Sequence, residues 1–262
     1  MSRVLLTTTG VLMLAFLCLP ALIVIPMSFS GASSLEFPPP SFSLRWYQSF
    51  FGDARWLLAL QNSVIIALAS SCIALLLGGV AAYGLVRGTF RGKPLIEGVF
   101  IAPLVVPAVV IAVALYLFFA RIGLLGTIPG LVIVHTVLGV PYVILVVSVA
   151  IRAFDQRIEQ VALSLGASSF TMFRRVLLPN LLPSVFAAWI FALIASFDEV
   201  IITYFLAGRY DTLPKRMFNE LALQVNPTIT AIATLLIGLS VLTMGLIALL
   251  LRRGGVRVEE LT

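Results

Sequence analysis

The stretch WLLALQNSVIIALASSCIALLLGGVAAYGLV, from Trp56 to Val86, contains no charged side chain. A helix rises about 1.5 Å per residue and the hydrocarbon layer of a membrane is about 30 Å thick, so about 20 apolar residues cross it. The stretch is long enough and therefore predicts a transmembrane helix. The rest of the chain has the same character, because 61% of its 262 residues are hydrophobic and only 11% are charged.

This composition limits the class of protein. The mean hydropathy is +1.13, and a soluble fold with this composition would expose a large apolar surface to water. We therefore exclude a cytosolic globular enzyme, a disordered chain and a nucleic-acid-binding protein. The two cysteines, Cys18 and Cys72, are too few for a disulfide framework. The expected fold class is an all-α, multi-pass membrane protein.

Six apolar stretches meet the length requirement for crossing a membrane. The predicted transmembrane helices cover roughly residues 8–29, 58–86, 98–120, 129–151, 183–207 and 227–251. The first could be mistaken for a cleavable signal peptide, but it is long and no clear small-x-small cleavage site follows it, so we expect a retained helix. Residues 1–262 then form a single transmembrane domain.

The basic residues predict how the helices are oriented. With six spans, both termini and two of the longer loops share one side of the membrane, and eleven of the 17 basic residues fall there. They are Arg3, Arg87, Arg91, Lys93, Arg152, Arg157, Arg174, Arg175, Arg252, Arg253 and Arg257. Because short cytoplasmic loops carry an excess of Lys and Arg, we expect both termini and the loop after the fourth span to be cytoplasmic.

That loop, residues 152–182, differs from the rest of the chain. Four apolar residues follow helical spacing and predict a short amphipathic helix: Ile158, Val161, Ala162 and Leu165. Gly166 interrupts the pattern, and Ser168 or Ser169 can cap a second helical piece that begins near Phe170. Because an apolar stripe in water needs a partner, the loop is either a docking element or a helix that lies flat on the membrane.

Residues 160–179, QVALSLGASSFTMFRRVLLP, resemble the motif shared by the membrane subunits of bacterial binding-protein-dependent ABC importers. The motif reads Glu-Ala-Ala, three residues, Gly, nine residues, Ile-x-Leu-Pro. Its positions are occupied here by Gln160, Val161, Ala162, Gly166, Val176, Leu178 and Pro179. Gln160, Val161 and Val176 depart from the motif, but the gap lengths are intact. Glu159 lies one position before the expected acid and can substitute for it.

The resemblance extends over essentially the whole chain. Residues 44–47 (LRWY), 196–200 (SFDEV) and 212–214 (TLP) are similar to the same family. Together they look most like the second permease subunit of spermidine/putrescine importers and of their opine and phosphonate relatives. The resemblance implies a second, different permease subunit, two ATPase subunits and a periplasmic binding protein as partners, in a bacterial inner membrane.

The same resemblance implies that the loop is a coupling helix held in a cleft of the ATPase subunit. The residues it assigns to this contact are Glu159, Gln160, Val161, Ala162, Gly166, Ala167, Val176, Leu178 and Pro179. The chain itself has no glycine-rich phosphate loop that ends in Lys-Ser or Lys-Thr, so ATP hydrolysis is expected on separate subunits. We expect a non-enzymatic permease that works by alternating access, with no cofactor and no metal site.

Asp198 and Glu199 are the only adjacent acids inside a predicted span. An acid at the membrane centre costs about 2.5–3.5 kcal/mol, so it is seldom retained without a role. At helical spacing, Ala192, Ser196, Glu199 and Thr203 would form a narrow stripe that faces a water-filled passage. We expect the two acids, with Ser196 and Thr203, to line the pathway of a cationic substrate. The alternatives are an ion pair with a basic residue of a partner helix and an acid at a helix end that reaches the outer interface.

Aromatic residues and one histidine leave further alternatives open. Trp46 and Tyr47 belong to a predicted interfacial helix over residues 43–53. They would anchor that helix at the headgroups or add aromatic faces to a cation pathway. His135, the only histidine, lies in the fourth predicted span. A lone membrane histidine ordinarily makes a helix-to-helix hydrogen bond, and a proton or substrate role is the alternative.

The favoured substrate is a polyamine such as spermidine or putrescine, and the alternative within the class is an opine, an aminophosphonate or another small solute. An ion-coupled secondary transporter is the alternative from a different class. It should show inverted repeats and broken helices with midplane ion ligands, and the sequence shows neither. An intramembrane enzyme would need a catalytic set that Asp198, Glu199 and the distant His135 do not resemble.

Overall fold

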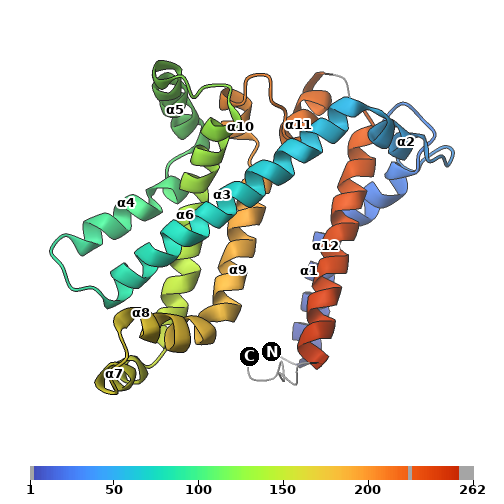
Figure 1. Cartoon of the computed structure of the whole chain (residues 1–262). Helices are drawn as coiled ribbons and strands as arrows, with labels where there is room; N and C mark the ends of the chain where they lie inside the picture. Colours follow the sequence, from blue (N-terminus) through green and yellow to red (C-terminus); the bar gives the residue numbers. More distant parts are fainter. Residues whose placement is uncertain (1–2, 224–225, 254–262) are drawn as a thin grey trace. The chain divides into compact units, whose positions relative to one another are not determined.

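The computed structural model describes residues 3–223 and 226–253, and the named elements in these ranges are all helices (Figure 1). The predicted cytoplasmic ends of the chain, including Arg257, lie outside the described residues. The chain divides into two compact units. The larger is Leu58–Arg216, and the smaller combines Met1–Leu57 with Met217–Thr262.

Helices occupy each of the predicted spans. Four segments are long and apolar enough to cross a membrane: Val4–Ser28, Ala54–Arg87, Ile128–Ala153 and Ser169–Phe197. A fifth candidate is a bent pair, α4 (Lys93–Val105) and α5 (Ala108–Ile122), whose axes differ by 103°. A shorter apolar segment, Thr228–Leu242, lies in the sixth predicted range. The third predicted span is therefore two helices and not one.

The break between α4 and α5 has a local cause in the sequence. Pro107 cannot donate a backbone hydrogen bond, and the residue before a proline is pushed out of the helical region. Val106 accordingly has extended dihedral angles, with φ −73° and ψ 130°, and Pro107 is the N-cap of α5. The fifth predicted span is also broken, because α9 (Leu178–Phe197) ends before the two acids and α10 (Ile201–Leu206) begins after them.

The core of the larger unit is built around α3 (Ala54–Arg87) and α6 (Ile128–Ala153). One apolar cluster joins these two helices to α9 through Ala74, Val143, Val147, Ala188 and Ala192. A second joins them to α5 and α10 through Ile66, Phe119, Leu131, Val134 and Ile202. α6 thus packs against helices on both sides of the break that follows α9.

The smaller unit contains α1 (Arg3–Ser28), α2 (Arg45–Gly52) and α12 (Thr228–Arg253), and α1 and α2 both pack against α12. The hydroxyls of Ser28 and Tyr47 lie 2.7 Å apart and tie the end of α1 to α2. α2 coincides with the predicted interfacial helix. α11 (Leu213–Leu223) begins in the larger unit and ends in the smaller one.

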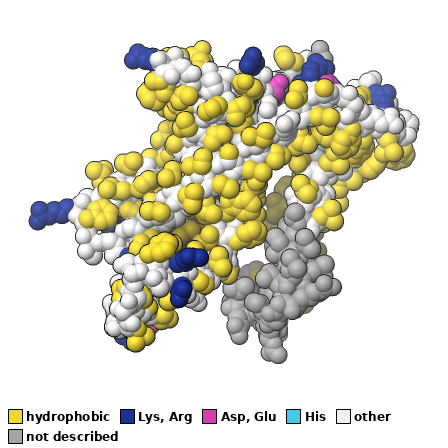
Figure 2. All heavy atoms as spheres, viewed as in Figure 1, with side chains coloured by type: hydrophobic (Ala, Val, Ile, Leu, Met, Phe, Trp, Pro, Cys, Tyr) yellow, Lys and Arg dark blue, Asp and Glu magenta, His cyan; other side chains and the backbone are white. Residues whose placement is uncertain are grey.

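The surface of the larger unit is largely apolar. Figure 2 shows hydrophobic side chains over the lengths of the helices, with dark blue Lys and Arg side chains near their ends. Large side chains such as Leu76, Val80 and Val149 are each at least 69% exposed. Such a surface suits lipid and not water.

Gly78 allows α3 to approach α6 closely. A Cβ atom added there would lie 2.8 Å from Cβ of Val143, whereas one added at Gly79 would meet nothing within 4 Å. Gly78→Ala should therefore lower the unfolding temperature of the detergent-solubilised protein, since overpacking costs about 1–3 kcal/mol. Gly79→Ala is the matched control and should keep or raise it, because alanine favours a helix by about 1 kcal/mol. Equal unfolding temperatures for the two variants would contradict this packing.

Candidate functional site

The loop after α6 forms two short helices and a π-helical turn. They are α7 (Gln156–Ser164), α8 (Ser169–Met172) and η1 (Phe173–Leu177), which leads directly into α9. Asp155 caps α7 by accepting the N–H of Arg157 at 2.9 Å, and Ser168 caps α8 by accepting the N–H of Thr171 at 3.2 Å. Residues 155–177, called the projection below, lie at one end of the larger unit (Figure 1).

Gly166 forms the joint of the projection. Its φ is +87°, a left-handed value that costs about 1–2 kcal/mol for a residue with a side chain. The N–H of Gly166 donates to the carbonyl of Leu163 at 3.0 Å, and the N–H of Ala167 donates to that of Ala162 at 3.1 Å. These two bonds are the Schellman pattern that ends a helix at a glycine. The glycine is therefore required by the turn, as its interruption of the helical pattern suggests.

The apolar residues of the projection point in different directions. Val161, Leu165 and Phe170 are 56%, 82% and 71% exposed, and they are called the docking residues below. Ala162 is half-buried and packs on the cluster that joins α3, α6 and α9. The predicted stripe is thus divided: Ala162 contacts the core, whereas Val161 and Leu165 form an apolar surface that needs a partner.

The remaining motif positions connect the projection to the membrane helices. Gln160 is exposed, Ala167 is half-buried, and Val176 and Leu178 lie half-buried on either side of the fully buried Leu177. Pro179 is exposed in the first turn of α9. The last residues of the motif therefore belong to the start of α9, which connects the projection to the membrane helices.

Glu159 is turned into the protein and not toward solvent. Its Oε1 lies 2.6 Å from Nη2 and 2.9 Å from Nε of Arg87, the last residue of α3. Nη2 of Arg87 also donates to the carbonyl of Phe154 at 3.0 Å. The two side chains are only 14% and 5% exposed. The pair connects the projection to α3. The sequence did not predict this connection, because it indicated for Arg87 only a role in membrane topology.

The two adjacent acids lie in the break between α9 and α10. Asp198 is the C-cap of α9 and is exposed. Glu199 is half-buried, and its Oε1 accepts the N–H of Ile202 at 2.8 Å. A helix N-terminus has N–H groups without helical partners and favours negative charge, so this contact stabilises the start of α10. Neither acid forms a salt bridge with a basic residue of the described part of the chain.

Glu199 lines a cavity of about 340 Å³. The other walls are residues 103–108 at the α4–α5 break, Leu138 and Tyr142 of α6, and Ile202 of α10. Two separate helix breaks therefore face one cavity, which contains a carboxylate and a phenol among apolar groups. Non-helical backbone at membrane depth is tolerated where it is buried in protein or lines a water-filled cavity. Asp198 is not among the lining residues of this cavity.

Ser196 and Thr203 are buried inside the bundle, at 5% and 0% exposure. Both contact His135, whose Nδ1 lies 2.8 Å from Oγ of Ser196 and whose Nε2 lies 3.0 Å from Oγ1 of Thr203. The expected helix-to-helix hydrogen bonds of this histidine are confirmed. Of the predicted stripe, Ala192 is also buried, and only Glu199 lines the cavity. The reason is that the break after α9 ends the helical spacing on which the stripe depends.

Trp46 and Tyr47 belong to α2 in the smaller unit. The guanidinium of Arg45 lies 4.1 Å from the centre of the Trp46 ring, so a cation of this chain occupies that aromatic face. The hydroxyl of Tyr47 is bonded to Ser28 and its ring lies 5.3 Å from that of Phe29. These contacts give both aromatic residues a local structural role.

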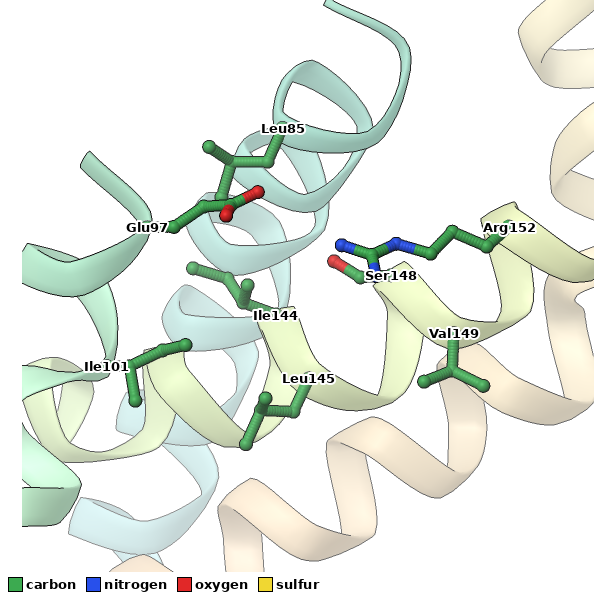
Figure 3. Close-up of a pocket in the computed structure, with 8 residues that line it drawn as sticks. All are labelled: Leu85, Glu97, Ile101, Ile144, Leu145, Ser148, Val149 and Arg152. Atoms are coloured by element: carbon green, nitrogen blue, oxygen red, sulfur yellow. The ribbon is translucent and has the colours of Figure 1, made fainter. Parts of the chain in front are cut away.

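A second cavity, of about 130 Å³, lies among α3, α4 and α6. Glu97 of α4 and Arg152 of α6 point into it toward one another, and Leu85 and Ile144 lie on either side of the Glu97 carboxylate (Figure 3). Among the described residues, no group of three His, Cys, Asp or Glu side chains is placed to hold a metal ion. The larger cavity, which Glu199 lines, is the better candidate for a solute because of its volume.

Comparisons with known proteins agree with the resemblance in the sequence. Residues 74–254 match the model of the family described as "binding-protein-dependent transport system inner membrane component". The spermidine/putrescine transport system permease protein PotC of Escherichia coli K12 is 32% identical over 227 residues, or 86% of each chain. The putrescine transport system permease protein PotI of the same organism is 33% identical over 231 residues, which cover 85% of this chain and 82% of PotI.

The fold also has a solved counterpart. A chain of a bacterial ABC transporter that imports the polysaccharide alginate superposes with a TM-score of 0.68, at 15% sequence identity, over 97% of this chain and 98% of that one. This likeness concerns the fold alone. The family match covers more than half of the sequence, and the identity to PotC extends over most of it. The chain therefore belongs to the family of inner membrane components of binding-protein-dependent transport systems.

Proposed function

We propose that this chain is a permease subunit of an ABC importer that carries a polyamine such as spermidine or putrescine across a bacterial inner membrane. The observation that carries the proposal is the projection, in which three exposed apolar side chains stand on a glycine-jointed pair of helices rooted in the membrane bundle. ATP hydrolysis belongs to two separate ATPase subunits. A second permease subunit and a periplasmic binding protein complete the importer.

The proposed topology has six spans with both termini in the cytoplasm. It is supported by the apolar helices found in the six predicted ranges, with the α4–α5 pair counted as one bent span. The excess of basic residues on the side of the projection supports a cytoplasmic location for it. The docking residues would then face the ATPase subunits, and the helix break with the two acids would lie deeper in the membrane.

In this mechanism, the projection moves with the ATPase subunits as a rigid body. The buried pair of Arg87 and Glu159 connects α7 to α3, and η1 runs without interruption into α9. Movement of the projection would therefore displace α3 and α9 together, since both are joined to it by the chain or by a buried ion pair. Rigid-body displacement of packed helices is what alternating access requires.

The first test concerns the docking residues. Val161→Glu places a charge on a side chain that is 56% exposed, so folding should be preserved while burial against a partner becomes unfavourable. We expect ATPase subunits to be lost from the purified complex. Gln156→Glu is the matched control, because it adds the same charge to the exposed N-terminus of α7, where a helix favours it. A Val161→Glu complex with its full complement of ATPase subunits would contradict the docking role.

The second test concerns the buried ion pair. Arg87→Met leaves the Glu159 carboxylate buried without its cation, and losing one partner of a buried pair costs about 3–5 kcal/mol. We expect lower thermal stability and weaker ATP-driven uptake, with partial recovery of both when Arg87→Glu is combined with Glu159→Arg. Arg91→Met removes an exposed charge nearby and should change neither. If Arg87→Met matches Arg91→Met in both measurements, the pair does not connect the projection to α3.

The polyamine assignment rests on the two acids and on the names of the relatives. Charged amines pair with carboxylates through charge-assisted hydrogen bonds, which are about twice as strong as neutral ones. Asp198 presents an exposed carboxylate at the end of α9, and Glu199 presents one to the cavity. PotC and PotI carry spermidine/putrescine and putrescine in their names. The same carboxylates would repel the anionic groups of an opine or an aminophosphonate, so these solutes would gain less from them than a polyamine does.

The third test removes these charges one at a time. Asp198→Asn and Glu199→Gln should each lower spermidine uptake by about tenfold in proteoliposomes that contain the assembled importer, as expected for the loss of a charged hydrogen bond. Glu97→Gln makes the same change in the smaller cavity and is the control. Undiminished spermidine uptake by both acid variants would contradict the polyamine pathway. If the importer instead transports an anionic solute, it belongs to another substrate class.

A further inference from the structure

The ring of His135 contacts both sides of the break between α9 and α10. It is 1% exposed and lies in the first third of α6. Its Nδ1 lies 2.8 Å from Oγ of Ser196, in the last turn of α9, and its Nε2 lies 3.0 Å from Oγ1 of Thr203, in the first turn of α10. The residues between these two partners include Asp198 and Glu199. A single side chain from a neighbouring helix thus spans the segment that carries both acids.

The direction of the hydrogen bond between His135 and Thr203 follows from the single proton on the Thr203 hydroxyl. Oγ1 of Thr203 donates its only proton to the carbonyl of Glu199 at 3.1 Å. It must then accept from His135, which places a ring proton on Nε2, while Nδ1 lies 2.8 Å from the hydroxyl and 3.1 Å from the carbonyl oxygen of Ser196. Oγ of Ser196 in turn accepts from Ser70 of α3 at 2.9 Å. A continuous series of polar contacts therefore runs from α3 through Ser196, His135 and Thr203 to the backbone of Glu199.

We propose that His135 is a positioning residue that holds the break in the geometry which presents the Glu199 carboxylate to the cavity. This inference rests on the proposed function, in which that carboxylate meets an amine. The backbone of Glu199 is held by Thr203, and its side chain is held by the N–H of Ile202. Thr203 is in turn held by His135. Without the His135 ring, Thr203 would lose its hydrogen bond to α6, and the segment that carries the Glu199 carboxylate would be held less firmly.

The location makes such a support necessary. The three residues of the break, 198–200, are not helical, so the ends of α9 and α10 have backbone groups without intrahelical partners. In a membrane these groups must be satisfied by the protein itself. Hydrogen bonds in a surrounding of low polarity are also stronger and more directional than in water. The histidine network can therefore fix an otherwise pliable segment without a covalent connection.

The test measures how many amine molecules are transported per ATP hydrolysed by the complete importer in proteoliposomes, with spermidine as the probe. His135→Ala and Thr203→Val remove the contact between the two residues. We expect each to lower this ratio by about threefold to tenfold, the equivalent of one lost hydrogen bond. The reason is that an amine held by a misplaced carboxylate escapes before the transporter turns inward, while the ATPase subunits continue to cycle.

Two further variants separate positioning from packing. At position 135, the amide nitrogen of a Gln side chain would lie near the position of histidine Nε2, and that of an Asn side chain near the position of Nδ1. His135→Gln should therefore retain the Thr203 contact and a ratio near that of the wild type, whereas His135→Asn retains only the Ser196 contact and should resemble His135→Ala. Ser71→Ala is the control, because it removes a buried hydroxyl of α3 that bonds the carbonyl of Leu68 in its own helix at 3.2 Å.

The possible outcomes distinguish this inference from the proposed function. If His135→Ala and Thr203→Val lower uptake and ATP hydrolysis in the same proportion, the ring has only a packing role and the inference is wrong. The same holds if Glu199→Gln lowers the ratio while Thr203→Val does not. If Glu199→Gln itself leaves the ratio unchanged, then the pathway role of that acid fails, and the inference fails with it. The inference is supported if His135→Asn lowers the number of amine molecules transported per ATP and His135→Gln keeps it near the wild-type value.

Discussion

Backbone amides and carbonyls inside a hydrocarbon layer have no water to bond, and the larger unit depends on how this constraint is met. Continuous helices such as α3 and α6 satisfy their own backbone groups. The two breaks, at residues 106–107 and 198–200, cannot do so, and at the second one other residues of the protein supply the contacts. The Glu199 carboxylate accepts an N–H at the start of α10, and His135 bonds residues on both sides of its break.

The same breaks line the cavity of about 340 Å³ that contains Glu199. The 103° bend at Pro107 turns α5 away from the line of α4, and the loss of helix after Phe197 releases Glu199 toward the opening. Glu199 thus combines structural support with a proposed solute contact, since its carboxylate accepts an N–H of α10 and also lines the cavity.

At the opposite end of the unit, a buried ion pair and a glycine turn shape the projection. Arg87 and Glu159 hold α7 against the end of α3, and the turn at Gly166 directs α8 into η1 and α9. Burying the apolar side of Ala162 leaves Val161 and Leu165 outside. The exposed residues and the anchoring residues are neighbours in sequence, so the exposed surface is connected directly to α3 and α9.

Much of this organisation follows from local patterns in the sequence. Long apolar runs predict helices that match α1, α3, α6 and α12 within a few residues, because a membrane-spanning helix must bury its backbone over a fixed length. Ser168 as a cap and Gly166 as a joint are also local features, and the structure has both. The family was recognisable for the same reason, since its motif lies in one continuous segment.

What the sequence could not determine was which residues meet across the bundle. The partner of Glu159 is 72 residues away in the chain, and those of His135 are 61 and 68 residues away. The stripe of Ser196, Glu199 and Thr203 assumed a continuous helix, and its division into buried hydroxyls and a cavity-facing acid depends on the break. The sequence determined the helices because their spacing is local. Only the tertiary structure decided the ion pair, the histidine network and the cavity, because each depends on how separate helices pack.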